Sequence, residues 1–284
     1  MDNRTLNFTF PPELKIASFE KLDIGETTTN DVYFCRGKYR NHPADFYVKV
    51  NENPPSYLSN EKNVLEALTS TFIPAPRVIW YEKQKKEILV LEAVKGFLLW
   101  DYIDPRRQRY DKQKVLPYLS TYGEFLAKIH NLKLKWEPQK RLKLYHLIGE
   151  QDLDDDRFVP LVSWLRNNEP VQKTQVFVHG DCNTASVIFD EDKISGIIDW
   201  EFAGLGWKEY DLAWILRARL NFLNTNAERQ AILGGYKKVS TYDEETLQWC
   251  EVLNYLHFAY WDRNDDPGYT KFAIQKAQEI IRKH

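Results

Sequence analysis

The chain has 284 residues and a mass of 33.7 kDa, which is enough to bury a sizeable core in two lobes or one large domain. Its 39 basic and 41 acidic residues leave a formal charge of -2, which argues against a nucleic-acid partner. The cysteines Cys35, Cys182 and Cys250 are far apart, so neither a disulfide framework nor a structural zinc site is expected. The amino terminus lacks an apolar signal core, and no apolar run approaches a membrane span. We therefore expect a soluble, cytoplasmic protein that binds neither membrane nor nucleic acid.

The amino-terminal third of the chain is typical of short strands around one helix. Residues 32–35 and 46–50 are β-branched and aromatic runs on either side of a turn-like stretch, residues 37–43, and this pattern predicts a hairpin. A further strand is predicted at residues 88–91, after a charged turn. Between them a helix is predicted, with capping chemistry from Ser59-Asn60-Glu61 and an apolar face formed by Val64, Leu65 and Leu68.

After Val94-Lys95-Gly96 the pattern becomes helical. We therefore predict an α+β chain with a small strand-rich lobe, residues 1–94, and a larger, mainly helical lobe, residues 95–284, joined by a connector at about 91–96. The second lobe begins with a helical stripe formed by Leu116, Leu119, Tyr122, Phe125, Leu126 and Ile129. Further helices are predicted at residues 212–223, 227–236, 244–261 and 271–282.

One hairpin is predicted among these helices. Residues 187–189 and 194–198 are apolar runs on either side of a polar turn, residues 190–193. Because a short hairpin brings its two ends together, Ser186 and Asp199 should be neighbours, beside the loop His179-Gly180-Asp181.

Two carboxylates should therefore converge at one edge of this small sheet. Asp181 follows a strand-like run, residues 176–178, and Asp199 ends the returning strand of the hairpin. Converging carboxylates repel each other unless a cation or a hydrogen-bond network separates their roles. A divalent ion on Asp199, with Asp181 accepting a proton from a substrate hydroxyl, would supply two ingredients of phosphoryl transfer. On these residues alone, both carboxylates could equally be turn residues that cap strand ends.

The order of these segments resembles the aminoglycoside phosphotransferase and choline kinase family, whose members are relatives of protein kinases. Its pattern is H-G-D-x-x-x-x-N, then I-D-[WF]-E-x-A-x-x-G, then D-L-A. This chain follows it at residues 179–186, with a serine at the last position, at residues 198–206, and at Asp211-Leu212-Ala213. The resemblance implies a bilobal, protein-kinase-like fold, with a small antiparallel sheet and one helix in the first lobe. It also implies transfer of the γ-phosphate of ATP, or of GTP, to a hydroxyl of a small molecule. Candidate acceptors are an aminoglycoside or other antibiotic, an amino alcohol such as choline, a sugar or an amino acid.

The resemblance also implies roles for individual residues. Asp181 would be the catalytic base, and Asp199 with Ser186 would hold Mg²⁺. In the first lobe, Lys49 would contact the nucleotide phosphates and Glu61 would be its ion-pair partner. An exposed, solvated Lys and Glu is the ordinary alternative.

Two further parts of the first lobe are expected to contact nucleotide. The connector would pair with adenine through its backbone, at Glu92 and Val94. The loop at residues 24–31 would cover the phosphates, with hydroxyl contacts from Thr28 and its neighbours. That loop holds a single glycine, Gly25, so an ordinary polar turn is an equal alternative.

Ser186 is the main departure from the family pattern, because it stands where an asparagine metal ligand is expected. A serine hydroxyl can bind magnesium, although it is a shorter and weaker donor than an amide. Asn183 lies closer to Asp181 in sequence and could take its place. The alternative hypothesis is therefore that the chain is a catalytically degenerate, kinase-like module that binds a nucleotide or another ligand.

The acceptor and the supporting residues are less well defined. Acidic stretches at residues 152–156 and 262–266 would suit an amine-bearing substrate, but solvated loops explain them equally. His179 and Asp211 are expected to position the loop by hydrogen bonding rather than to react. Oligomeric state is left open. A cage for a quaternary ammonium group and ordinary core packing are both open for Trp200, Trp207, Trp214, Phe258, Tyr260 and Trp261.

Overall fold

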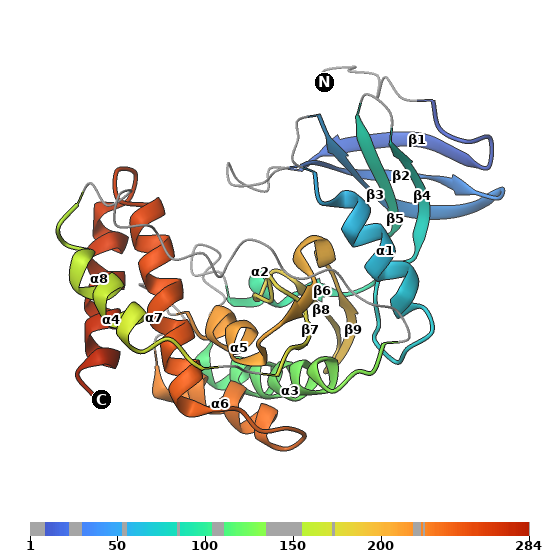
Figure 1. Ribbon diagram of the computed structural model, residues 1–284. Helices are drawn as coiled ribbons and strands as arrows, with labels where there is room; N and C mark the ends of the chain where they lie inside the picture. Colours follow the sequence, from blue (N-terminus) through green and yellow to red (C-terminus); the bar gives the residue numbers. More distant parts are fainter. Residues whose placement is uncertain are drawn as a thin grey trace. The chain divides into compact units, whose positions relative to one another are not determined.

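The chain divides into two compact units, Met1–Val94 and Lys95–His284. They are shown in the computed structural model of Figure 1. Within the described residues, no helix is long and apolar enough to cross a membrane. The structure describes residues 9–22, 30–52, 56–83, 86–103, 111–134, 155–171, 174–217, 223 and 225–283.

The first unit is built on an antiparallel sheet of five strands in the order β1-β2-β3-β5-β4. One helix, α1, packs against β4 and β5 and buries Val64, Leu65 and Leu68 there (Figure 1). The elements are β1 (Leu14–Lys21), β2 (Asp31–Tyr39), β3 (His42–Asn51), α1 (Leu58–Leu68), β4 (Val78–Lys83) and β5 (Glu87–Glu92).

The hairpin of β2 and β3 is present, but its turn is much shorter than residues 37–43. Only Arg40 and Asn41 turn the chain, with φ of 49° and 67°, and Tyr39 already pairs with His42. Successive left-handed residues suit the twist of a two-residue hairpin turn. A Cβ on Gly37 would lie 2.0 Å from the carbonyl oxygen of Lys15, so a glycine is required at this position, where β1 pairs with β2.

Three other features of the first unit differ from the prediction. Strands β1 and β4 were not predicted, although Val78-Ile79-Trp80-Tyr81 of β4 is a β-branched and aromatic run. The capping chemistry assigned to Ser59-Asn60-Glu61 is also wrong. The helix begins one residue earlier, and Ser56 Oγ accepts a hydrogen bond from the Leu58 N–H at 3.3 Å.

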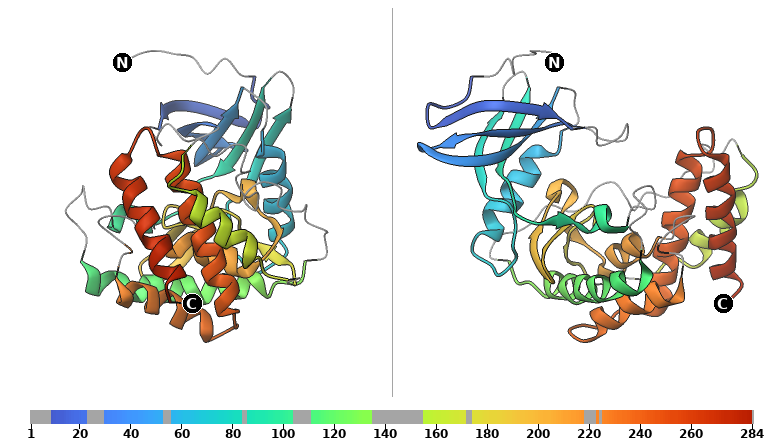
Figure 2. Two further views of the ribbon diagram at one scale, coloured as in Figure 1. Left: turned by 60° about the vertical axis from the view of Figure 1, so that its left-hand side comes forward. Right: turned by 180° about the vertical axis from the view of Figure 1, so that it is seen from behind.

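The second unit combines helices with two small sheets, β6-β8-β9 and β7-β10. Helices α4, α7 and α8 pack together at one end, and α3 runs alongside α6 (Figures 1 and 2). The helices are α2 (Leu99–Ile103), α3 (Lys112–His130), α4 (Val159–Asn167), the short 3₁₀ helix η3 (Trp200–Phe202), α5 (Lys208–Leu216), α6 (Asn226–Lys237), α7 (Glu244–Trp261) and α8 (Pro267–Ile281). The strands are β6 (Phe97–Leu98), β7 (Val176–Val178), β8 (Val187–Asp190), β9 (Lys193–Ile197) and β10 (Gly204–Gly206).

Each predicted helix of this unit is present; α7 has the predicted bounds, and the others have shifted ends. Helix α5 begins before residue 212 and ends at Leu216, while residues 218–222 of the predicted helix lie outside the described part of the chain. Helix α8 begins at Pro267 because Asp266 caps it, accepting the Tyr269 N–H at 2.8 Å. Helix α4 was not predicted.

Two glycines allow α3 and α6 to pack backbone against backbone. A Cβ on Gly123 would lie 2.1 Å from the carbonyl oxygen of Ile232, and one on Gly235 would lie 2.0 Å from that of Ser120. This contact fixes α3, whose last residue, His130, contacts Asp211 on α5.

The hairpin of β8 and β9 forms as predicted, with Val187 opposite Ile197. The pairing continues past the strands, because the Ile198 N–H donates to the Ser186 carbonyl at 2.9 Å. Ser186 and the residue that follows Ile198, Asp199, therefore lie side by side at the open end of the hairpin.

Candidate active site

The buried carboxylate of Asp211, on α5, holds the loop between β7 and β8 by hydrogen bonds. Its Oδ2 accepts the backbone N–H of His179 at 2.7 Å, and its Oδ1 accepts that of Gly180 at 3.0 Å. Gly180 has φ of 91°, a conformation that favours glycine. Asp211 therefore braces the loop through its backbone, as expected from the family pattern.

His130 supports Asp211 from α3, although no motif in the sequence indicates this role. Its Nε2 donates to Asp211 Oδ2 at 3.2 Å, and its Nδ1 lies 2.8 Å from the hydroxyl of Tyr236. Both His130 and Asp211 have fully buried side chains. The available signal was a histidine next to Ile129, at the end of an apolar helical stripe, but such a residue is usually part of the core.

His179 links the loop to the end of the hairpin. Its Nε2 lies 2.8 Å from the Ile198 carbonyl, and its Nδ1 lies 3.2 Å from the Asp181 N–H. A carbonyl only accepts and an N–H only donates, so Nε2 carries the proton and Nδ1 does not. The imidazole is therefore neutral and positions the backbone, in agreement with the role predicted for it.

The carboxylate of Asp181 is oriented by two side-chain donors and is partly exposed. Its Oδ1 accepts the indole N–H of Trp214 at 2.7 Å and an amide N–H of Asn183 at 3.3 Å. The amide oxygen of Asn183 accepts the Ala185 N–H at 2.7 Å, so both ends of this amide serve the loop. That geometry gives no support to Asn183 as a replacement metal ligand.

Ser186 and Asp199 provide the oxygen atoms expected of a magnesium site. Ser186 Oγ donates to the Asp181 carbonyl at 2.9 Å, and the residue is only 1% exposed. Asp199 is partly exposed, and its backbone is left-handed, with φ of 64° and ψ of 52°. A non-glycine residue in that conformation is often found at a functional site.

This donor set fits a hard cation in kind, because it consists of oxygen atoms only. Magnesium in nucleotide sites is commonly held by one or two protein ligands, and phosphate oxygens and water complete the shell. Among the residues that the structure describes, no cluster of three or more His, Cys, Asp or Glu side chains could hold a metal.

Lys49 and Glu61 form a buried ion pair in the first unit. Lys49, on β3, places its Nζ 2.8 Å from Oε1 and 2.9 Å from Oε2 of Glu61, on α1. The residues are 7% and 1% exposed. This geometry differs from the ordinary solvated pair that was the alternative to a functional role.

The structure says less about the other residues that were predicted to contact the nucleotide, Glu92, Val94 and Thr28. At the end of β5, the Glu92 N–H donates to the Arg77 carbonyl at 2.9 Å, and the Glu92 carboxylate pairs with the Arg77 guanidinium at 3.0 Å. Val94 is the last residue of the first unit. Thr28, with residues 23–29, lies outside the described part of the chain.

The aromatic residues considered for a cationic cage are divided among several separate ring contacts, and Trp261 is 64% exposed. Cations do lie over three of these rings, but they belong to the chain. The Arg217 guanidinium carbon is 3.2 Å from the centroid of Phe258 and 5.1 Å from that of Trp214, and the Arg263 guanidinium carbon is 3.9 Å from that of Tyr260. The two acidic stretches have local roles as well, since Asp155 pairs with Arg157 and Asp266 caps α8. Ring contacts join Trp200 to Phe177, Trp207 to Trp249, Trp214 to Phe258, Tyr260 to Phe158 and Trp261 to His257.

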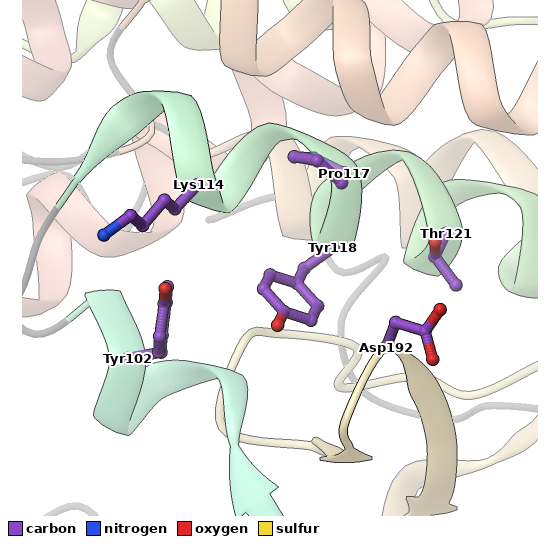
Figure 3. Close-up of a pocket in the computed structure, with 6 residues that line it drawn as sticks. All are labelled: Tyr102, Lys114, Pro117, Tyr118, Thr121 and Asp192. Carbon is purple, nitrogen blue, oxygen red and sulfur yellow. The ribbon is translucent and has the colours of Figure 1, made fainter.

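A pocket of about 440 Å³ lies away from the predicted catalytic residues. In Figure 3 the ring of Tyr118, on α3, lies between Tyr102, on α2, and Asp192, in the turn of the β8–β9 hairpin. Ser186 and Asp199 lie at the other end of that hairpin. The pocket is therefore not where the predicted catalytic residues meet.

Comparisons with known proteins agree with this architecture. A ternary complex of a thermostable mutant of aminoglycoside phosphotransferase APH(4)-Ia with AMP-PNP and hygromycin B superposes with a TM-score of 0.71, at 17% identity and over 94% of each chain. Choline kinase LicA from Streptococcus pneumoniae has a TM-score of 0.65, at 19% identity and over 95% of each chain. These structures confirm the bilobal, protein-kinase-like α+β fold.

The sequence comparisons identify the family. An aminoglycoside 3'-phosphotransferase of Niallia circulans is 25% identical over 241 residues, covering 77% of this chain and 86% of the relative. The profile of the phosphotransferase enzyme family matches residues 22–249. The chain therefore belongs to the phosphotransferase enzyme family and is a small-molecule phosphotransferase.

Proposed function

We propose that this chain transfers the γ-phosphate of ATP, or of GTP, to a hydroxyl of a small molecule, with Asp181 as the base. The observation that carries the proposal is the pair of links between Asp181 and the end of the hairpin. His179 and Ser186 each bond both to Asp181 and to Ile198, which precedes Asp199. One carboxylate that accepts a proton and one that can hold a metal therefore belong to a single local framework.

In the proposed reaction, the Asp181 carboxylate accepts the proton of the acceptor hydroxyl as its oxygen forms a bond to the γ-phosphorus. The bond from that phosphorus to the bridging β–γ oxygen breaks, and the nucleoside diphosphate leaves with the bonding electron pair. General-base assistance of this kind typically contributes about 10²–10⁴-fold in rate. The products are the phosphorylated acceptor, the diphosphate and a proton on Asp181.

The first unit is proposed to bind the nucleotide, and the second to bind the acceptor and carry the base. The charge of Lys49 suits phosphate oxygens, and Glu61 restricts its ammonium to one position. The backbone at Glu92 and Val94 is proposed to contact the base of the nucleotide. Magnesium held by Asp199, with the Ser186 hydroxyl, would neutralise charge on the phosphates.

The acceptor is proposed to be a small hydroxylated compound, since relatives of the same fold have been crystallised with hygromycin B or are choline kinases. Because these two acceptors differ greatly in size, the fold alone does not choose between them. Aminoglycosides, other antibiotics, amino alcohols, sugars and amino acids are the classes to screen.

Asp181→Asn tests the proposal directly. ADP release from magnesium ATP would be measured against that acceptor panel, and ATP affinity would be measured by calorimetry. We expect the substitution to lower turnover by about 10²-fold or more while ATP affinity stays within threefold, because the base acts on the acceptor and not on the nucleotide. Undiminished turnover in the purified variant would remove Asp181 from the mechanism.

A nucleotide-binding module without transfer activity is the second candidate, because the Ser186 hydroxyl is buried and donates to the Asp181 carbonyl. Ser186→Asn separates the two candidates. If ADP release rises at least tenfold, the native site is impaired by its serine. If ADP release falls, Ser186 belongs to a working variant of the site.

A further inference from the structure

Trp214 makes a contact that the reaction outlined above does not require. Its indole Nε1 donates to Oδ1 of Asp181 at 2.7 Å, which is shorter than the 3.3 Å contact from the Asn183 amide to the same oxygen. The residue is 9% exposed and follows Asp211 by one helical turn on α5. An N–H donor to a carboxylate forms a charge-assisted hydrogen bond, which is shorter and stronger than a neutral one.

Packing on several sides fixes the direction of this N–H. The ring stacks on Tyr210 at 5.7 Å, with an interplanar angle of 28°, and its centroid lies 5.1 Å from that of Phe258, on α7. The guanidinium carbon of Arg217 lies 5.1 Å from the Trp214 ring centroid. Because Phe258 of α7, Tyr210 of α5 and Arg217, which follows α5, contact the ring, the N–H points to one place without the flexibility of a lysine or arginine.

Helix α5 therefore positions the loop in two ways. Asp211 holds the backbone N–H groups of His179 and Gly180, and Trp214 holds the carboxylate of Asp181. Residues three apart lie on the same face of a helix, so both contacts are made from one surface. The backbone and the side chain of the loop are thereby fixed relative to each other.

We propose that Trp214 is a positioning residue for Asp181. The indole N–H, together with the Asn183 amide, bonds to Oδ1 and so fixes the orientation of the carboxylate that takes the acceptor proton. This inference rests on the proposed function of Asp181. It adds a residue to that function, because correct orientation of a base contributes to rate independently of the base itself.

Trp214→Phe tests the inference, because it removes the N–H and keeps an aromatic ring. The probe is ADP release from magnesium ATP, with water and with the panel compound that gives the fastest release. We expect kcat to fall about 10- to 100-fold while KM for ATP stays within threefold, since the orientation of the base affects only the transition state. Trp207→Phe is the matched control, because the Trp207 ring packs against Trp249.

Trp214→His provides a second variant, since a histidine ring retains an N–H and should recover part of the kcat lost with phenylalanine. Thermal midpoints and ATP affinity for all three variants show whether each is folded. A kcat for Trp214→Phe equal to that of the Trp207→Phe control would overturn the inference.

The Asp181→Asn background distinguishes failure of this inference from failure of the proposed function. If Asp181→Asn retains full turnover, the proposed function fails first. If Asp181→Asn is impaired and Trp214→Phe is not, only the role of Trp214 is lost. In the double variant we expect no loss beyond that of Asp181→Asn alone, because the two residues act as a unit. Additive losses would assign Trp214 to general stability instead.

Discussion

The ammonium of Lys49 lies within 2.9 Å of both carboxylate oxygens of Glu61, and the two residues are almost completely buried. Removing a charge from water is costly, and only a partner with good geometry compensates for it. The pair therefore joins β3 to α1 in a way that depends on both side chains. Removing either side chain leaves the other as a buried charge without this partner, and this destabilises the folded state.

Glu61→Ala should lower the free energy of unfolding by about 3–5 kcal/mol, because it leaves the buried ammonium of Lys49 without its carboxylate. Lys49→Met combined with Glu61→Leu should restore most of that stability while ATP turnover stays lost. Urea denaturation of the three proteins measures the first effect, and ADP release measures the second.

Glu66→Ala is the control on the same helix, because Glu66 pairs at 2.7 Å with Lys62 in a far more exposed i,i+4 arrangement. Exposed pairs of this kind are worth about 0.3–0.5 kcal/mol. A loss of that size for Glu61→Ala would contradict the burial argument.

Two adjacent glycines on α6 should respond to alanine in opposite directions. Gly235→Ala would place a Cβ 2.0 Å from the Ser120 carbonyl oxygen, whereas Gly234→Ala meets nothing within 4 Å. We expect Gly235→Ala to lower the free energy of unfolding by about 1–3 kcal/mol, through overpacking of α3 against α6. Gly234→Ala should raise it by about 0.5–1 kcal/mol, since alanine is the better helix former. If the urea midpoints of the two variants shifted in the same direction relative to the parent protein, the close packing would be refuted.

Asp211→Asn should lower kcat by about 100-fold, because one of its oxygens is replaced by an NH₂ group that cannot accept a backbone N–H. The two oxygens now hold the N–H groups of His179 and Gly180, so the loop that carries Asp181 should shift. Asp190→Asn is the matched control, because its exposed carboxylate pairs with Lys95 at 3.0 Å at the far end of the hairpin. Equal kcat values for the two variants would show that the brace is not needed for turnover.

The sequence predicted those parts of the site that depend on local periodicity. The hairpin that brings Ser186 beside Asp199 follows from two apolar runs around a polar turn, and the structure contains it. The pairing of Lys49 with Glu61 came from the family pattern, and the contact is present. These features involve residues that are close in sequence or fixed by a shared order of motifs.

The parts that could not be predicted depend on packing between distant elements. Trp214 reaches Asp181 across 33 positions of sequence, and His130 reaches Asp211 across 81. Nothing local distinguishes these side chains from ordinary core residues, because a buried indole or imidazole shows its partner only after the helices have packed. For the same reason, the sequence could not show which neighbour each ring of the proposed cage contacts.

His257 should make the second unit less stable in mild acid. Burial, and then the nearby charge of Arg217, lower the pKa of this imidazole below its ordinary value of 6.5. The unfolded chain therefore binds a proton more readily than the folded one, so the free energy of unfolding should fall as the pH drops below about 6.5. A single group can change the free energy of unfolding by at most about 1.4 kcal/mol per pH unit. His257→Gln should remove this contribution while leaving stability at pH 8 within about 1 kcal/mol. Urea denaturation of both proteins between pH 5 and pH 8 is the measurement, and parallel curves across that range would show that His257 is not held in its neutral form.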